Sequence, residues 1–171
     1  CLVDNGELIA FAPYGFVSYN IPNDVTIIGD SVFMDCDNLK TITIPDGVTR
    51  IKDAAFMDCN KLQSIDIPNS VTITLNGNAK KIGKSAFAYC ESATSIKIGT
   101  AVSTIGDNAF MDCLSATTIY SNAINPPTLA SEFVFFGIDM NNCKIYVPAS
   151  SLNDYKTARY WSMYADAIVA E

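Results

Sequence analysis

Short stretches of alternating apolar and polar residues recur along most of the chain. Residue Ile21 opens the stretch IPNDVTIIGDSVFMDCDNLKTIT, and Ile44, 23 residues later, opens IPDGVTRIKDAAFMDCNKLQSID. A third copy begins at Ile67 and carries eight extra residues, and a fourth copy covers residues 98–120 at the original length of 23. A fixed apolar pattern at this period predicts a solenoid, in which each copy is one turn that buries its core against its neighbours.

Several apolar columns run through the four copies. The aligned positions are Phe33, Phe56, Phe87 and Phe110; Cys36, Cys59, Cys90 and Cys113; Ile28, Ile51, Ile82 and Ile105; and Ile42, Ile65, Ile96 and Ile119. Within a copy, the spacing Leu39-x-x-Ile42-x-Ile44 is the leucine-rich-repeat strand pattern, with alternate residues facing in and out. Such strands in successive turns predict a parallel sheet.

The rest of each copy predicts a second wall and a corner. Residues 25–28 and 48–51 are short β-branched segments that suit the wall opposite the main strands. Asp30 and Asp53 follow these segments, where an aspartate can cap the first free amide groups of a short helical turn that carries Phe and Cys inward. We therefore expect a short helical turn in each copy.

The pattern IPxxVTxIGxxAFxxCxxLxxIxI resembles the BspA-like leucine-rich repeat family, found in surface and secreted proteins of anaerobic gut and oral bacteria. The resemblance covers residues 21–120, with residues 1–20 similar to the family's N-terminal hairpin and residues 121–171 similar to its closing unit. It implies one domain over residues 1–171. The fold expected is mainly β with short helices: a right-handed leucine-rich-repeat solenoid with parallel strands, an N-terminal hairpin and an α/β C-terminal cap.

The C-terminal segment is suited to covering the last turn of the solenoid. Pro126-Pro127 ends the repeat pattern, and residues 143–147 predict a final strand. Ser150 or Ser151 can cap a helix that carries Leu152 and Tyr155 inward. The aromatic residues that follow favour sealing of the core over the alternative, a sugar-binding platform; they are Tyr160, Trp161 and Tyr164.

Composition restricts the classes of function that the chain can have. The 171 residues carry a net charge of −7 and no histidine, so the commonest general base and metal ligand are absent. We expect no enzyme activity, although a hydrolase that uses two carboxylates needs no histidine. The acidic balance argues against nucleic acid, and the absence of a long apolar run argues against membrane insertion.

The cysteines and aspartates have structural explanations. Four cysteines share one repeat position, so their parallel side chains do not suit disulfides or a tetrahedral metal site, and we expect free, buried thiols. Two aspartate columns could in principle hold calcium between turns, but both are interrupted in the third copy by Lys84 and Tyr89. We predict no metal and no cofactor.

Two surfaces are candidates for partner binding. Asp66, Lys97 and Tyr120 point outward from successive main strands and would form a strip of charge with an aromatic anchor. The alternative is a solvated polar sheet face.

The extra residues 73–80 are the second candidate surface. They alternate up to Asn76-Gly77, which predicts a protruding hairpin near residues 71–82, and they lead into a basic cluster of Lys80, Lys81 and Lys84. This cluster could receive an anionic partner, and a tolerated loop insertion is the alternative.

These observations favour a binding role. The resemblance implies a non-enzymatic cell-surface or secreted leucine-rich-repeat module in protein–protein interaction or adhesion, with a host matrix or cell-surface protein as partner. The alternative is a carbohydrate-recognition or structural spacer module of a larger surface protein. The expected location is extracellular or on the surface of a bacterium.

Overall fold

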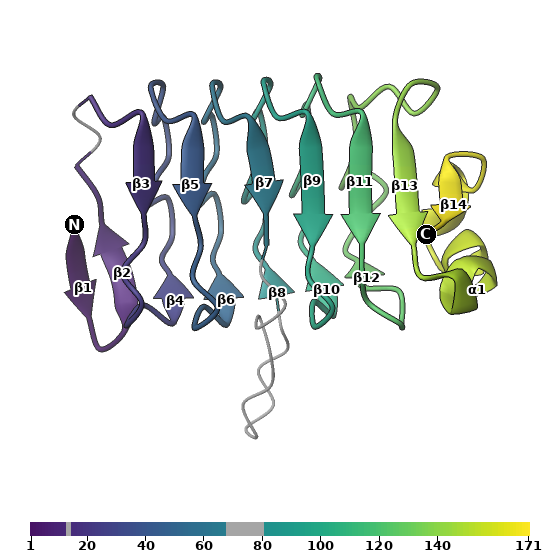
Figure 1. Cartoon of the computed structure of the whole chain (residues 1–171), viewed down its shortest axis with the longest axis horizontal. Helices are drawn as coiled ribbons and strands as arrows, with labels where there is room; N and C mark the ends of the chain where they lie inside the picture. Colours follow the sequence, from purple (N-terminus) through teal and green to yellow (C-terminus); the bar gives the residue numbers. More distant parts are fainter. Residues whose placement is uncertain (13–14, 68–80) are drawn as a thin grey trace.

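A computed structural model describes residues 1–12, 15–67 and 81–171, which form a solenoid of stacked turns (Figure 1). One wall is a seven-stranded sheet ordered β1-β2-β4-β6-β8-β10-β12. Its strands are β1 Leu2–Asp4, β2 Glu7–Ala10, β4 Ile27–Ile28, β6 Arg50–Ile51, β8 Lys81–Ile82, β10 Thr104–Ile105 and β12 Thr128–Leu129. Apart from the antiparallel pair β1–β2, all its neighbours are parallel.

The other wall holds the main strands of the repeats. Five of them form a parallel sheet: β7 Ser64–Asp66, β9 Ser95–Ile98, β11 Thr118–Ser121, β13 Lys144–Val147 and β14 Ile168–Ala170. The remaining two, β3 Ser18–Asn20 and β5 Thr41–Thr43, form a separate parallel pair. The predicted fold class, a mainly β leucine-rich-repeat solenoid with parallel strands, is confirmed.

A stack of phenylalanine rings runs through the core. Phe33, Phe56 and Phe87 lie with ring centroids 4.9 Å apart, and the next two steps, to Phe110 and Phe135, are 5.5 Å. Adjacent rings are tilted by 9° or less. These rings are buried, as are the isoleucines of the opposite wall. The three middle rings are therefore each buried between identical rings from the two adjacent turns, while Phe33 and Phe135 at the ends also contact other aromatic rings.

The prediction of a short helical turn after each short strand of the seven-stranded wall (β4, β6, β8 and β10) is wrong. The backbone N–H groups there donate to the next solenoid turn: Ser31 to the Asp53 carbonyl at 3.0 Å and Phe33 to the Ala55 carbonyl at 2.8 Å. Asp30 does not cap a helix, because its Oδ1 accepts a hydrogen bond from the Asp53 N–H at 3.1 Å. A helix would use up the donors that the neighbouring turn requires.

This corner is made possible by residues in the left-handed region. Ser31 and Asp35 have positive φ, and the same two positions recur with positive φ in the next copies, at Ala54 and Asp58, Ser85 and Tyr89, and Asn108 and Asp112. With positive φ at these two positions, four residues apart, the N–H groups of Ser31, Phe33 and Asp35 all point along the solenoid axis and donate to carbonyls of the next turn.

The cysteine column lies against this corner. All six cysteines are free, and all except Cys1 are buried. Three thiols hydrogen-bond to a Phe carbonyl of the preceding turn: Cys59 to Phe33, Cys90 to Phe56 and Cys113 to Phe87, at 3.1, 3.4 and 3.3 Å. Burial raises the pKa of Cys113 to about 12 and that of Cys143 to about 11, so these thiols remain protonated at neutral pH.

The N-terminal unit is shorter than predicted. Only β1 and β2 form a hairpin, while β3, which was also expected in it, already belongs to the main wall and pairs with β5. Lys52 fastens the hairpin: its Nζ lies 2.6 Å from Glu7 Oε1 on β2 and 3.8 Å from Asp30. Lys52 stands where three other copies have glycine.

The C-terminal unit continues the repeat further than predicted. Pro126-Pro127 does not end the pattern, because β12 follows directly and pairs with β10. The strand predicted over residues 143–147 is present as β13, although it is not the last strand, and helix α1, Leu152–Thr157, buries Tyr155. Neither serine hydroxyl caps this helix, since a 3-10 segment, Ala149–Ser151, precedes it.

The sequence did not predict strand β14. Trp161, in a second 3-10 segment, is fully buried and donates to the Pro127 carbonyl at 2.7 Å.

The thiol burial predicts strongly unequal cysteine reactivity. In the native chain, Cys1 should react rapidly with a disulfide reagent such as 5,5′-dithiobis(2-nitrobenzoate), while the five buried thiols should react only at the rate of unfolding, because the thiolate is the nucleophile. Thiol counting with and without denaturant measures this. All six should react in denaturant, and rapid reaction of a second thiol in the native chain would contradict the arrangement.

The ring stack predicts a large cost for a truncation at its centre. Phe87→Ala should lower the free energy of unfolding by about 3 to 5 kcal/mol, because it leaves a cavity between Phe56 and Phe110. Phe136→Ala is the matched control: this ring is 53% exposed, and its loss should cost less than about 1 kcal/mol. Urea unfolding followed by circular dichroism measures both. Equal losses of unfolding free energy in the two variants would show that the ring stack does not stabilise the core.

Candidate functional site

The structure places the three residues of the predicted strip side by side. The sheet register pairs Asp66 on β7 with Lys97 on β9, and Lys97 with Tyr120 on β11. Lys97 Nζ lies 3.7 Å from Asp66 Oδ2, and both side chains are more than half exposed. An ion pair with this exposure contributes little to stability, so both groups remain accessible to a partner.

Sequence reasoning missed a fourth member of this strip. Tyr146 on β13 is paired in register with Tyr120, and the two rings stack with centroids 5.0 Å apart. The signal was available, because Lys144-Ile145-Tyr146-Val147 has the same apolar alternation as the main strands. Asp66, Lys97, Tyr120 and Tyr146, called the recognition strip from here on, thus cross four adjacent strands.

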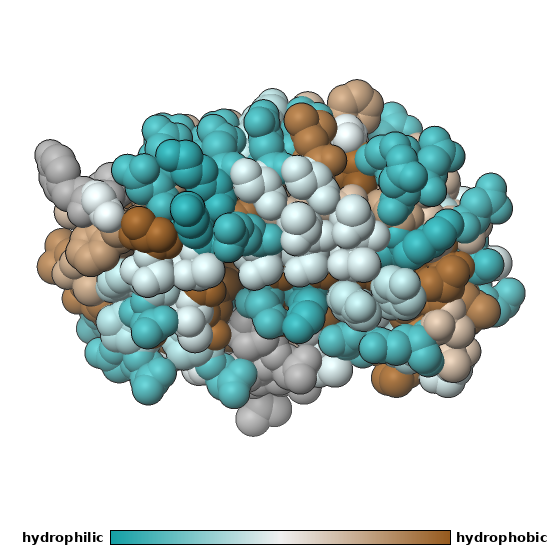
Figure 2. All heavy atoms as spheres, turned by 45° about the horizontal axis from the view of Figure 1, so that its top comes forward, coloured by the Kyte–Doolittle hydropathy of each residue, from teal (hydrophilic) through white to brown (hydrophobic). Residues whose placement is uncertain are grey.

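The recognition strip is set in a band of small polar residues. Figure 2 shows pale residues of intermediate hydropathy running across this side of the molecule, with hydrophilic residues above and below them. The threonines and serines of the main strands point outward here, as expected from the alternation in β5 and β7. Large hydrophobic side chains do not form a continuous patch across the band.

The main wall is discontinuous beside the recognition strip. Figure 1 shows a wider gap between β5 and β7 than between the other main strands, and no ladder joins the two. The Ile21 N–H donates to the Thr43 carbonyl at 3.1 Å, and the Ile67 N–H donates to the Lys97 carbonyl at 2.8 Å. Within the described residues, Ile44, which occupies the same repeat position, makes no such bond to Asp66.

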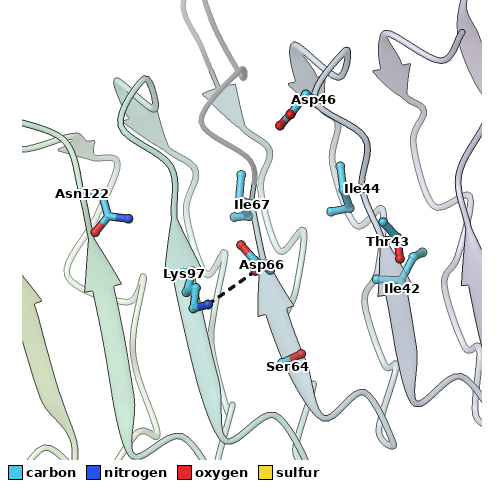
Figure 3. Close-up of a pocket in the computed structure, with 9 residues that line it drawn as sticks. All are labelled: Ile42, Thr43, Ile44, Asp46, Ser64, Asp66, Ile67, Lys97 and Asn122. Atoms are coloured by element: carbon cyan, nitrogen blue, oxygen red, sulfur yellow. Dashed lines mark ion pairs between the residues drawn. The ribbon is translucent and has the colours of Figure 1, made fainter. Parts of the chain in front are cut away.

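A hollow of about 520 Å³ opens at this break (Figure 3). The described residues that line it are Ile42, Thr43, Ile44, Asp46, Ser64, Asp66, Ile67, Lys97 and Asn122. Ile42 is half-buried, whereas its equivalents Ile65 and Ile96 are buried, so the break uncovers part of the core column. The hollow therefore combines apolar side chains with carboxylate, hydroxyl, amide and amine groups.

The two described lysines of the predicted basic cluster do not lie on this face. Lys81 lies on β8 of the seven-stranded sheet, and Lys84 follows it, with Nζ 4.0 Å from Asp107. Lys80 and Asn76 lie outside the described residues, as do residues 73–80 as a whole. The predicted hairpin near residues 71–82 can be compared only at its last two residues, Lys81 and Ile82, which are a parallel strand of the solenoid.

The aspartate columns serve the solenoid. Asp53 Oδ1 accepts a hydrogen bond from the Lys84 N–H at 2.8 Å, which repeats the link from Asp30 one turn earlier. In the other column, which contains Asp35 and Asp58, burial and the neighbouring carboxylates of Asp35, Asp37 and Glu91 raise the pKa of Asp58. In the part of the chain that the structure describes, no three Asp, Glu or Cys side chains are grouped to hold a metal ion.

The fold and its repeats define a leucine-rich-repeat protein. The family model for the BspA type leucine-rich repeat region matches residues 8–76 and 71–156, with six copies. The chain belongs to this family, as the resemblance predicted. The family match extends beyond the four copies read from the sequence, in agreement with the strands found at both ends.

Solved structures of bacterial proteins share this fold. A leucine-rich cell surface protein from Faecalibacterium prausnitzii is 26% identical, with a TM-score of 0.67 over 93% of this chain. A leucine-rich repeat protein from Eubacterium ventriosum is 24% identical, with a TM-score of 0.66 over 83% of the chain. The pneumococcal vaccine antigen PcpA is 19% identical, with a TM-score of 0.58 over 97% of the chain. No curated protein matches the sequence.

The similar structures are considerably longer than this chain. It spans 37% of the Faecalibacterium protein, 35% of the Eubacterium protein and 44% of PcpA. The likeness therefore concerns a repeat module that those proteins contain. Among the described residues, no helix has the length and hydrophobicity needed to cross a membrane.

The break between β5 and β7 predicts a local loss of amide protection. The N–H groups of Ile44 and Asp66 should exchange with deuterium at least about tenfold faster than that of Lys97, which lies in an unbroken ladder. Residue-resolved hydrogen exchange by NMR measures this, with the Tyr120 amide as a second reference in the intact sheet. Equal protection at all four amides would show that the sheet is continuous in solution.

Proposed function

We propose that the chain is a non-enzymatic interaction module of a bacterial cell-surface or secreted protein and that it binds a protein partner in adhesion. The observation that carries the proposal is the recognition strip, which places a carboxylate, an amine and two stacked tyrosines in register across four strands. The partner class is a host matrix protein or a protein on another cell.

The chemistry of the recognition strip suits a protein surface. Tyrosine is enriched among the residues that dominate binding energy at protein interfaces, because it brings a large, rigid contact area together with a hydroxyl group. Tyr120 and Tyr146 are half-buried, so most of their ordering is already achieved before a partner arrives. The exposed pair Asp66–Lys97 can set the orientation of a partner through its two opposite charges.

The architecture supports the same proposal. Repeat proteins use the extended surface of stacked turns for binding. The similar structure from Faecalibacterium prausnitzii is that of a leucine-rich cell surface protein, which supports the proposed location. The alternative of an aromatic sugar platform at the C-terminus loses its central residue, because Trp161 is fully buried.

Truncating two residues of the recognition strip should weaken partner binding without unfolding the chain. An array of extracellular-matrix proteins and glycans, probed with the purified chain, identifies the partner. Lys97→Ala combined with Tyr120→Ala should then weaken binding to the protein hit by about tenfold or more. Both side chains point outward, so the thermal midpoint should change by only a few degrees.

The matched control changes a basic and a hydroxyl residue on the other wall. Arg50→Ala combined with Thr128→Ala alters two exposed side chains of the seven-stranded sheet, outside both candidate surfaces, and should leave binding unchanged. A variant without residues 73–80 tests the insertion separately. Unaltered affinity of the Lys97/Tyr120 variant, or loss of binding only on deletion of residues 73–80, would refute the role of the recognition strip.

A further inference from the structure

The hollow between β5 and β7 presents backbone groups that the sheet leaves unpaired. In a parallel ladder, alternate residues direct both their N–H and their C=O toward the same neighbouring strand. Thr43 bonds toward β3, so Ile42 and Ile44 face β7, and by the same alternation Asp66 faces β5. Between described residues, the Ile44 N–H does not donate to the Asp66 carbonyl, and no ladder joins β5 to β7. A backbone donor and a backbone acceptor therefore face each other across the break without the bond that the regular repeat would form.

Unpaired backbone groups of this kind select a ligand that both donates and accepts. A secondary amide supplies one N–H and one C=O, which is what an adjacent strand would present to each edge. A cationic side chain has no acceptor for the Ile44 N–H, and an anion has no donor for the Asp66 carbonyl. The edges of the break thus favour an amide.

The amide must belong to a compact ligand. The break is closed at one end, where the Gln63 N–H donates to the Lys40 carbonyl at 3.0 Å. An extended peptide passing between β5 and β7 would require the two strands to move apart to twice the usual spacing of about 4.8 Å and would break this bond. The closed end therefore excludes a through-running strand and leaves room for a small group at the open end.

The remaining side chains suit a polyol with an apolar substituent. The half-buried Ile42 offers an apolar surface of the kind that a methyl group covers, with the buried Ile44 and Ile67 beside it. Around them lie Asp46, Asp66 and Asn122, with the hydroxyls of Thr43 and Ser64, and such groups accept from and donate to sugar hydroxyls. Figure 3 shows Asp46 and Asn122 on opposite sides of the hollow, with Asp66 between them and Lys97 directed toward Asp66.

From these features we infer that the hollow is a binding site for an N-acetylhexosamine, the acetamido group lying at the break and the ring hydroxyls at the polar rim. The volume of about 520 Å³ lies within the usual range for small-molecule sites, about 300 to 1,000 Å³. The site goes beyond the proposed protein partner, because it recognises a sugar residue at a place adjoining the recognition strip. A glycan that ends in such a residue is the natural ligand class.

The experiment is a titration of the chain followed by ¹H–¹⁵N correlation NMR. N-acetylglucosamine and N-acetylgalactosamine should give saturable shifts at Ile44, Asp66 and Lys97, with a dissociation constant on the order of 1 mM for a ligand of this size. Glucose and galactose, which lack the acetamido group, should bind at least about tenfold more weakly, because the backbone groups at the break then stay unpaired.

Two tryptophan variants of one strand locate the site. Thr43→Trp fills the hollow and should weaken N-acetylhexosamine binding at least tenfold, whereas Thr41→Trp, on the same face of β5 but outside the lining, should leave it unchanged. Asn122→Ala, on the far rim, gives a second test if Thr43→Trp perturbs the fold.

Three outcomes would overturn the assignment. They are the absence of saturable shifts with both N-acetylhexosamines, equal binding of the parent hexoses, and shifts that persist unchanged in Thr43→Trp and Asn122→Ala. n-Butylammonium, a cation without an amide, would identify a cation site instead if it shifts the same amides when the sugars do not.

Discussion

Contact between successive turns at close to 5 Å is the constraint on which the whole structure depends. The same distance must suit the spacing of paired strands, the thickness of stacked aromatic rings and the length of the hydrogen bonds at the corner. The observed ring separations of 4.9 to 5.5 Å show that one repeat length satisfies all three. A residue that does not fit the strand spacing, the ring stack or the corner hydrogen bonds therefore disturbs the adjacent turns as well as its own.

Much of the fold follows from the sequence because the constraint is repeated. Aligning Phe33 with Phe56 or Ile28 with Ile51 identifies the inward positions without any knowledge of distant contacts. Outward positions follow by alternation, which is why Asp66, Lys97 and Tyr120 could be placed on one face. Their role in binding is not settled by this placement and stays a proposal.

The errors share a physical origin. Asp30 in front of a polar stretch is a good cap for a helix, but its carboxylate is used between turns, and the competing partner lies 23 residues away in sequence. The end units were also misjudged: β3 and β12 are too short and too diverged for the repeat to show, yet each is held in place by an adjacent strand. The break beside β5 has no sequence signature in β5 itself, since Thr41–Thr43 keeps the regular alternation.

The same break has a mechanical consequence. A force applied along the solenoid axis is borne by the bonds that join successive turns, and among the described residues β5 and β7 share no ladder, only the Gln63–Lys40 bond near their start. At this interface the load is carried by the corner bonds, such as that from the Asp35 N–H to the Met57 carbonyl, and by the pairing of β4 with β6 in the seven-stranded wall. Under tension the solenoid would bend and part here first, and the turns on either side would separate as two intact blocks.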